Sequence, residues 1–462
     1  MSAATREPYF QRWRRLSRPA RLYLLHVALL TASLAIVGLF FNIAILALGF
    51  SIDFLGLLNT VSFAASAIVS VPLLWLLTRI RLRLALLASA ALQLASVLLF
   101  ALWPAPPALL IASALIGVAA VLFEVSAPPF MMRHSTAATR DHLFSANAAI
   151  RVGLAGVGSL LAGQLPGLAA RLLGVGAESA AAYQATMALA AAGVLLAMAP
   201  LLVMSVVRDP LPAAEDQHQS QEPRTESRGS ELLVSDHPSV AEDKQPTTGS
   251  GQQTKPQSAI GNRQSAIPES WRDLARHPAA LLKLLISPAL ISVGAALLIP
   301  YLNLFFKQRF GVADQTLGLI FAALGITTGA AALAGPAISA RIGKIRTVVL
   351  TQALALPFLI VLGFAPLLGV AVGAALVRAA LFNMGTPLYD AFAMERADEA
   401  ARPALIGLIN GAYSIGYAFA PLISVRIQAA YGFGPLFVAT AMLYTLAVLA
   451  KYWFFVRYQP AL

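Results

Sequence analysis

The sequence predicts an all-α polytopic membrane protein, with twelve transmembrane helices arranged as two pseudo-symmetric six-helix bundles. Three observations support this fold class: the composition, the recurrence of long charge-free segments, and an internal repeat. Of the 462 residues, 58% are hydrophobic and only 12% are charged, whereas soluble domains contain roughly 25% charged residues. This balance argues against a water-soluble globular protein.

Charge-free segments of transmembrane length recur along the chain. A bilayer core about 30 Å thick requires roughly 20 apolar residues in a helix, and such segments are found from residue 22 to residue 450. A β-barrel is excluded because the segments are too long and lack a period of two. The predicted spans are 22–50, 54–78, 84–103, 108–132, 143–170, 179–207, 279–306, 315–340, 347–367, 370–394, 403–425 and 432–456.

Two polar segments define the predicted domain organisation. Residues 1–21 form an arginine-rich arm, and residues 208–276 form a linker rich in Gln, Ser, Glu, Pro and Thr, a composition that cannot bury a core. We expect this linker to be largely disordered, a tether between bundles at 22–207 and 277–462; a regulatory role stays open.

The distribution of basic residues predicts the orientation in the membrane. Cytoplasmic loops of membrane proteins are enriched in Lys and Arg. Seventeen of these residues lie on the side of the N-terminus, whereas the opposite loops contain only Arg171, Lys307, Arg309 and Arg426. We therefore expect a multi-pass protein of the plasma (inner) membrane with both termini cytoplasmic. The net charge of +12 is then a topology signal, and no nucleic-acid partner is expected.

The two halves of the sequence align with a nearly constant offset of 261 to 263 residues. Each match falls at the same place in the order of predicted helices. Parallel six-helix repeats are one known arrangement for alternating access. The matched pairs are Asn42 and Asn303, Gly56 and Gly318, Arg79 and Arg341, Arg140 and Arg402, Asn147 and Asn410, and Gly153 and Gly416.

With this repeat, the sequence resembles the major facilitator superfamily outside the arm and the linker. The family's loop pattern Gly-x-x-x-Asp-Arg-x-Gly-Arg-Arg, between helices 2 and 3 and between helices 8 and 9, survives only in part here. Arg79 and Arg83 remain in the first copy, and Arg341 and Gly343 in the second. Glu395 matches an acidic residue that the family has at the end of helix 10. The resemblance implies that these five residues form a cytoplasmic gate, with Glu395 near Arg341 or Arg346.

Among the charged residues inside predicted spans, where a charge costs roughly 2.5–3.5 kcal/mol on insertion scales, three stand out. Arg378 lies midway along its helix, and either binds an anionic or polar substrate group or pairs with a carbonyl or Asp390. Glu124 and Arg151 lie at similar depth on consecutive helices, so an ion pair between them is geometrically plausible. Glu124 is then either a proton-coupling carboxylate or half of a structural pair.

Polar residues without charge offer further candidates. Asn383 lies near Arg378, and Asn42 and Asn303 occupy matched positions in the outer parts of their helices. Each of these three either lines the substrate path or forms interhelical hydrogen bonds. Asp53 and Asp314 stand at outer helix starts, where helix capping is the simpler account.

The sequence predicts a secondary active transporter that moves a small organic, amphiphilic solute by alternating access; proton-coupled drug-type efflux is one form that stays open. Apolar walls with few buried charges favour an amphiphile over a sugar. No nucleotide-binding or hydrolase motif is present, because Gly343-Lys344 is followed by Ile345, and the chain contains no cysteine. We expect that the protein is not an enzyme and that it uses no cofactor or metal. We also expect a monomer whose partners are the solute, the lipid bilayer and protons. The alternative is a receptor or lipid scramblase on a transporter fold.

Overall fold

The computed structural model describes residues 16–77, 80–204, 278–396 and 402–457. The predicted linker, residues 1–15 of the predicted arm and Arg79 lie outside these ranges. The described helices of both halves belong to one unit. The described part of the chain is helical and contains no strand, in agreement with the predicted fold class.

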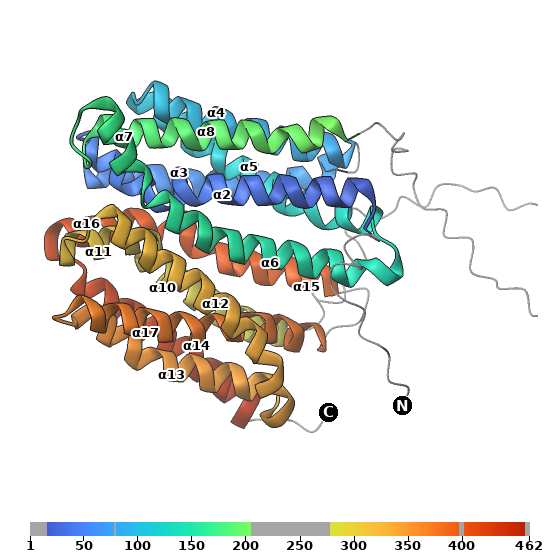
Figure 1. Cartoon of the computed structure of the whole chain (residues 1–462). Helices are drawn as coiled ribbons and strands as arrows, with labels where there is room; N and C mark the ends of the chain where they lie inside the picture. The colour runs from blue at the N-terminus through green and yellow to red at the C-terminus, as the bar shows by residue number, and fades with distance from the viewer. Residues whose placement is uncertain (1–15, 78–79, 205–277, 397–401, 458–462) are drawn as a thin grey trace, which may run out of the picture. The chain divides into compact units, whose positions relative to one another are not determined.

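The first half of the chain contributes seven helices to the described structure, which run side by side in Figure 1 apart from the short α7. They are α2 (Arg18–Ala47), α3 (Ile52–Leu77), α4 (Leu82–Leu102), α5 (Pro106–Arg133), α6 (Ala137–Ala162), α7 (Leu165–Leu173) and α8 (Ala180–Val203).

The second half has the same order of long helices, with short elements where a span is interrupted. They are α10 (Pro278–Leu298), η1 (Ile299–Tyr301), α11 (Leu302–Phe310), α12 (Asp314–Ile342), α13 (Lys344–Phe364), α14 (Leu368–Met394), α15 (Arg402–Ile415), η3 (Gly416–Ala418), α16 (Ala420–Tyr431), α17 (Gly434–Lys451) and η4 (Tyr452–Arg457).

These elements give twelve helical segments, among the described residues, that are long and apolar enough to cross a membrane, which confirms the predicted number. Three predicted spans are interrupted. The span at 279–306 breaks at η1, which contains Pro300, and the span at 403–425 breaks at η3, shortly before Pro421. Proline lacks the amide hydrogen that a continuing helix requires, and its ring clashes with the preceding turn. The span at 143–170 breaks between α6 and α7, where Pro166 follows.

Small residues and serine hydroxyls hold the helices of each half together. In the first half, Ser89 and Ser96 of α4 donate to the carbonyls of Ala119 and Ala112 of α5 at 2.8 and 2.7 Å. In the second half, Thr440 of α17 donates to a carbonyl of α10 at 2.9 Å. Helices in a membrane associate through such close packing and hydrogen bonds because lipid supplies no hydrophobic driving force between them.

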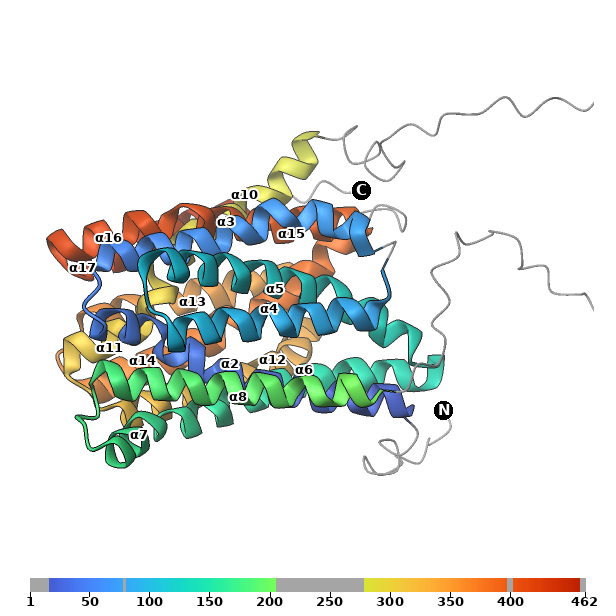
Figure 2. The same cartoon turned by 90° about the horizontal axis from the view of Figure 1, so that it is seen from above.

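The two halves meet along α6 against α12 and along α3 against α16, neighbours that can be followed in Figures 1 and 2. Gly318 and Gly56, a matched pair of the sequence repeat, lie in these two contacts. A Cβ atom on Gly318 would stand 2.6 Å from the carbonyl oxygen of Ser159, and one on Gly56 would overlap the side chain of Val425. The repeat therefore preserves glycine where the halves approach most closely.

Candidate functional site

A cavity of about 970 Å³ lies between the two halves. Helix α6 lines it from the first half, and α10, α12, α14, α15, η3 and α17 contribute from the second. Most of its lining side chains are apolar or aromatic. The aromatic ones are Phe321, Phe382, Tyr413, Tyr417 and Tyr444.

Arg378 of α14 lines this cavity although only 7% of its surface is exposed. Its guanidinium carbon lies 5.6 Å from the ring centre of Phe382 and 5.9 Å from that of Tyr444, distances typical of cation–π contacts. The Nε atom is buried and has no hydrogen-bond partner among the described residues. Asn383 lines the same cavity.

The alternative pairing of Arg378 with Asp390 does not occur. Both residues lie on α14, and twelve residues of α-helix separate them by about 18 Å along the axis. None of the described carboxylates forms an ion pair with Arg378. Its positive charge therefore faces the cavity without a described acidic partner.

Glu124 of α5 and Arg151 of α6 form the two-point ion pair that their depth in the sequence makes plausible. Arg151 donates through Nη1 to Glu124 Oε2 at 3.2 Å and through Nη2 to Oε1. Arg151 lines the cavity, and its guanidinium carbon lies 5.8 Å from the ring centre of Phe123. Glu124 itself does not line the cavity, but its carboxylate contacts Arg151, which does.

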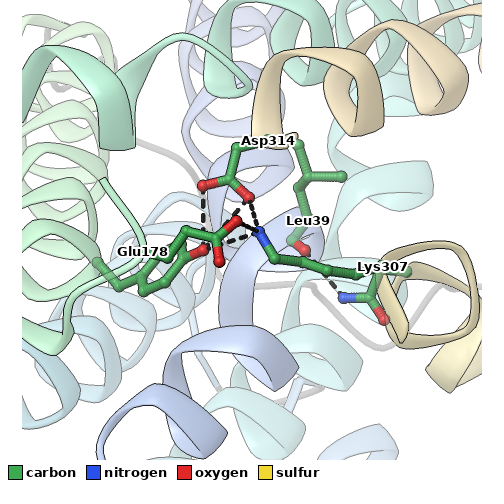
Figure 3. A network of polar contacts seen from close by, with 6 residues as sticks. Leu39, Glu178, Lys307 and Asp314 are labelled. Atoms are coloured by element: carbon green, nitrogen blue, oxygen red, sulfur yellow. Dashed lines mark hydrogen bonds and ion pairs between the residues drawn. The ribbon is translucent and has the colours of Figure 1, made fainter. Parts of the chain in front are cut away.

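An ionic network joins the halves at the end of the bundle where α7 and α11 lie, which we call the far end (Figure 1). In Figure 3 the ammonium of Lys307 lies between the carboxylates of Asp314 and Glu178, with 2.8 Å from Nζ to Glu178 Oε1. The Tyr183 hydroxyl donates to Asp314 Oδ2 at 3.0 Å and accepts from Lys307 at 3.2 Å. Asp314 is thus not a helix cap: Ala313 caps α12, and the Asp314 carboxylate points into the network.

Asn42 and Asn303 join α2 to α11, and neither lines the cavity. The Asn42 amide donates to Asn303 Oδ1 at 3.0 Å, and the Asn303 amide donates to the carbonyl of Leu39 at 2.9 Å. Asn42 and Asn303 therefore form interhelical hydrogen bonds instead of lining the substrate path, which were the two interpretations of this pair. Among the described residues, the hydrogen bonds and ion pairs between the halves all lie toward the far end.

Comparison with known proteins identifies the family. The family model described as Major Facilitator Superfamily matches residues 23–401 and 284–462. The chain belongs to the major facilitator superfamily. No curated protein matches the sequence.

Three solved structures share the fold of this superfamily member. One is a bacterial homologue of the human lysosomal transporter Spinster in an inward-facing, unoccupied conformation, with 14% identity, coverage of 96% of this chain and 94% of that chain, and a TM-score of 0.67. A D-xylose–proton symporter has 15% identity, coverage of 96% and 98%, and a TM-score of 0.67. The nucleoside transporter NupG has 13% identity, coverage of 94% and 97%, and a TM-score of 0.61. At these identities the likeness shows the fold alone.

Two described residues that the family resemblance assigns to a gate, Arg83 and Glu395, make contacts within their own halves. Arg83 donates to the carbonyls of Leu201 at 2.7 Å and Leu202 at 2.9 Å, and so satisfies the last turn of α8. Glu395 pairs with Lys344, not with Arg341 or Arg346. Gly343 has a φ of 89°, a conformation that glycine adopts without strain, and there the chain passes from α12 to α13.

One buried cation escaped the sequence analysis of this superfamily member. Lys451 of α17 is fully buried, and its ammonium donates to Gln352 Oε1 at 2.7 Å and lies 4.7 Å from the ring centre of Tyr389. Asp390 is close enough to interact with it electrostatically. The available signal was a lysine inside the predicted span 432–456, at the end of a charge-free segment.

Proposed function

We propose that this protein is a secondary active transporter that carries a small amphiphilic organic solute through the central cavity by alternating access. The observation that carries this proposal is the cavity of about 970 Å³ between the two repeat-related halves. In transporters built from two such halves, the substrate site lies at their interface, and the halves rock around it. Apolar walls with a few polar groups suit a solute that is itself mostly apolar.

The far-end contacts support an inward-facing state for this proposal. Lys307, Glu178, Tyr183 and Asp314 close the interface on one side of the cavity. The excess of Lys and Arg in the opposite loops supports a cytoplasmic location for the other side and for both termini. In the plasma membrane, the cavity of this state would then exchange solute with the cytoplasm, as the first step of efflux requires.

Proton coupling through Glu124 is the second part of the proposal. Its carboxylate is held by Arg151, which itself lines the cavity. Protonation of Glu124 would release Arg151 from the pair and change the charge on the cavity wall. A gradient of protons could in this way drive drug-type efflux. The competing account is a pair that only joins α5 to α6.

A cytoplasmic gate in the outward-facing state completes the cycle. We propose that Arg79, Arg83, Arg341, Gly343 and Glu395 form this gate when that end closes, with Glu395 near Arg341 or Arg346, as the family resemblance implies. The exposed Glu395–Lys344 pair would then exchange partners. An exchange of this kind should let a charge-reversed Arg341 or Arg346 rescue a charge-reversed Glu395 in flux assays.

The direct test is a thermal-shift screen of amphiphilic compounds on the purified protein, followed by flux in proteoliposomes with and without a pH gradient. Saturable uptake of a compound that also stabilises the protein is expected. Movement of labelled lipid between leaflets without any solute flux would instead favour a scramblase. Stabilisation by a ligand with neither activity would favour a receptor.

A further inference from the structure

We propose that the cavity selects organic monoanions: an oxyanion head group binds Arg378, and an apolar body lies against the aromatic wall. This inference rests on the proposed function and specifies its substrate class. It follows from the charge balance of the cavity, the surroundings of Arg378, and the chemistry of the remaining lining.

The charge balance of the cavity leaves one positive charge uncompensated. Among the described residues that line it, Arg151 and Arg378 are the charged ones, and no acidic side chain joins them. Glu124 neutralises Arg151 through two contacts. Arg378 has no described ion-pair partner. A buried guanidinium has lost its favourable hydration, and the binding of an anion can compensate for that loss of free energy.

The surroundings of Arg378 hold the guanidinium in place chiefly through ring contacts. Phe382 and Tyr444 stack on one another with ring centres 4.4 Å apart, and both contact the guanidinium. Cation–π contacts of this kind do not consume N–H groups. The Tyr444 hydroxyl also interacts with the Arg378 guanidinium, and Nε has no partner among the described residues. A carboxylate or sulfonate accepts two parallel bonds from such a fork.

The rest of the lining fits the body of an amphiphile. Phe321, Tyr413 and Tyr417 add aromatic surface, while Asn383 and Thr386 continue along α14 from Arg378 and offer neutral polar contacts. The volume of about 970 Å³ accommodates a drug-sized molecule. A neutral solute would leave Arg378 unpaired, and an organic cation would be repelled.

The test compares ligands that share a body and differ in the head group. Three bodies, naphthyl, decyl and steroidal, are each prepared as carboxylate, primary amide and amine, and their affinities for the full chain in a neutral detergent are measured by calorimetry. With at least one body, the carboxylate should bind about 10- to 100-fold more tightly than the amide, as expected for a charge-assisted hydrogen bond. Arg378→Gln should remove this preference while amide binding persists. Arg309→Gln, which changes an exposed arginine of α11, should leave it intact.

Three results would overturn the inference: no carboxylate binds with any body, carboxylate and amide bind equally, or Arg378→Gln keeps the preference. Arg378→Lys tests the site if the glutamine variant fails to fold, and should keep charge selectivity with weaker affinity.

Displacement of the carboxylate by anionic lipid in nanodiscs would support the same head-group chemistry with the bilayer as its source. Saturable flux of amines or neutral compounds alone would refute anion selectivity and leave the transporter standing. Arg378-dependent anion binding without flux under any gradient would refute transport and leave the site standing.

Discussion

Removing the hydroxyl of Tyr183 should open the far end of the protein. Tyr183 of α8 belongs to the first half, and its hydroxyl donates to Asp314 of the second half at 3.0 and 3.2 Å. Both side chains are buried, with 1% and 7% exposed. Tyr183→Phe deletes this bond and keeps the ring, whose centre lies 5.7 Å from that of Phe40.

The size of the effect follows from which contacts cross the interface. The Lys307–Asp314 pair lies within the second half, so it persists when the halves separate. The contact of Lys307 with Glu178 does cross, but Glu178 is 65% exposed, and exposed ion pairs contribute about 0–1 kcal/mol. A buried hydroxyl that donates to a carboxylate contributes about 1.5–3 kcal/mol. Because Asp314 can be hydrated once the far end opens, the loss falls on the closed state, and the ratio of open to closed molecules should rise about 10- to 150-fold.

The chain contains no cysteine, so spin labels can be placed without background. Leu172→Cys and Tyr431→Cys mark the far ends of the two halves at positions 79% and 77% exposed, and pulsed electron paramagnetic resonance measures the distance distribution between them. Tyr183→Phe should add a longer-distance population. Tyr389→Phe is the matched control, because that hydroxyl donates to Leu284 within one half. If the two variants give the same distribution, the Tyr183 bond does not hold the halves together.

Three further outcomes are expected. Cysteines introduced at Ser2 and Ser250 should resist membrane-impermeant thiol reagents in intact cells, since the charge distribution predicts that both segments are cytoplasmic; labelling from outside would contradict this topology. Glu124→Gln should bind solute as the unmodified protein does but show flux that no longer responds to a pH gradient, and an unchanged response would leave a structural pair. The Lys451→Met variant should unfold at the same or a higher temperature, because the substitution removes a buried charge. The Gln352→Leu variant should lose about 1–3 kcal/mol of stability, because it leaves the Lys451 ammonium without an acceptor. An equal loss of stability in both variants would contradict this account.

The fold was predictable because membrane insertion imposes a local rule. Every backbone amide in lipid must be satisfied within its own helix, so twelve apolar segments had to become twelve helices. The interruptions were not predictable by the same rule. Pro288 lies inside the continuous α10, whereas Pro300, twelve residues later, lies in the break that follows it. Whether proline bends or ends a helix depends on which neighbours satisfy the freed carbonyls, and that is a tertiary property.

The candidate site was predictable only where depth alone decides a contact. Glu124 and Arg151 meet because helical rise places them at the same level on consecutive helices. Asp314 was assigned to capping from its position at a helix start, yet its partners Tyr183 and Lys307 come from two other segments. Lys451 was not a predicted site residue, and only the packing of α13 and α14 encloses it.

Arg378 and Glu124 break the repeat that Gly56 and Gly318 obey. At the offset of 262 residues that relates Gly56 to Gly318, Arg378 corresponds to Ile116, and Glu124 corresponds to Thr386. Alternating access as proposed would use both copies of the glycine contacts, because the halves would close about the cavity at each end in turn, whereas each of the two charged residues would be needed once. Because the neutralised pair belongs to the first half and the unpaired guanidinium to the second, a proton taken up by Glu124 and an anion taken up by Arg378 would act on opposite walls of one cavity. Such an arrangement lets the charge of the cavity change on both sides before the halves move.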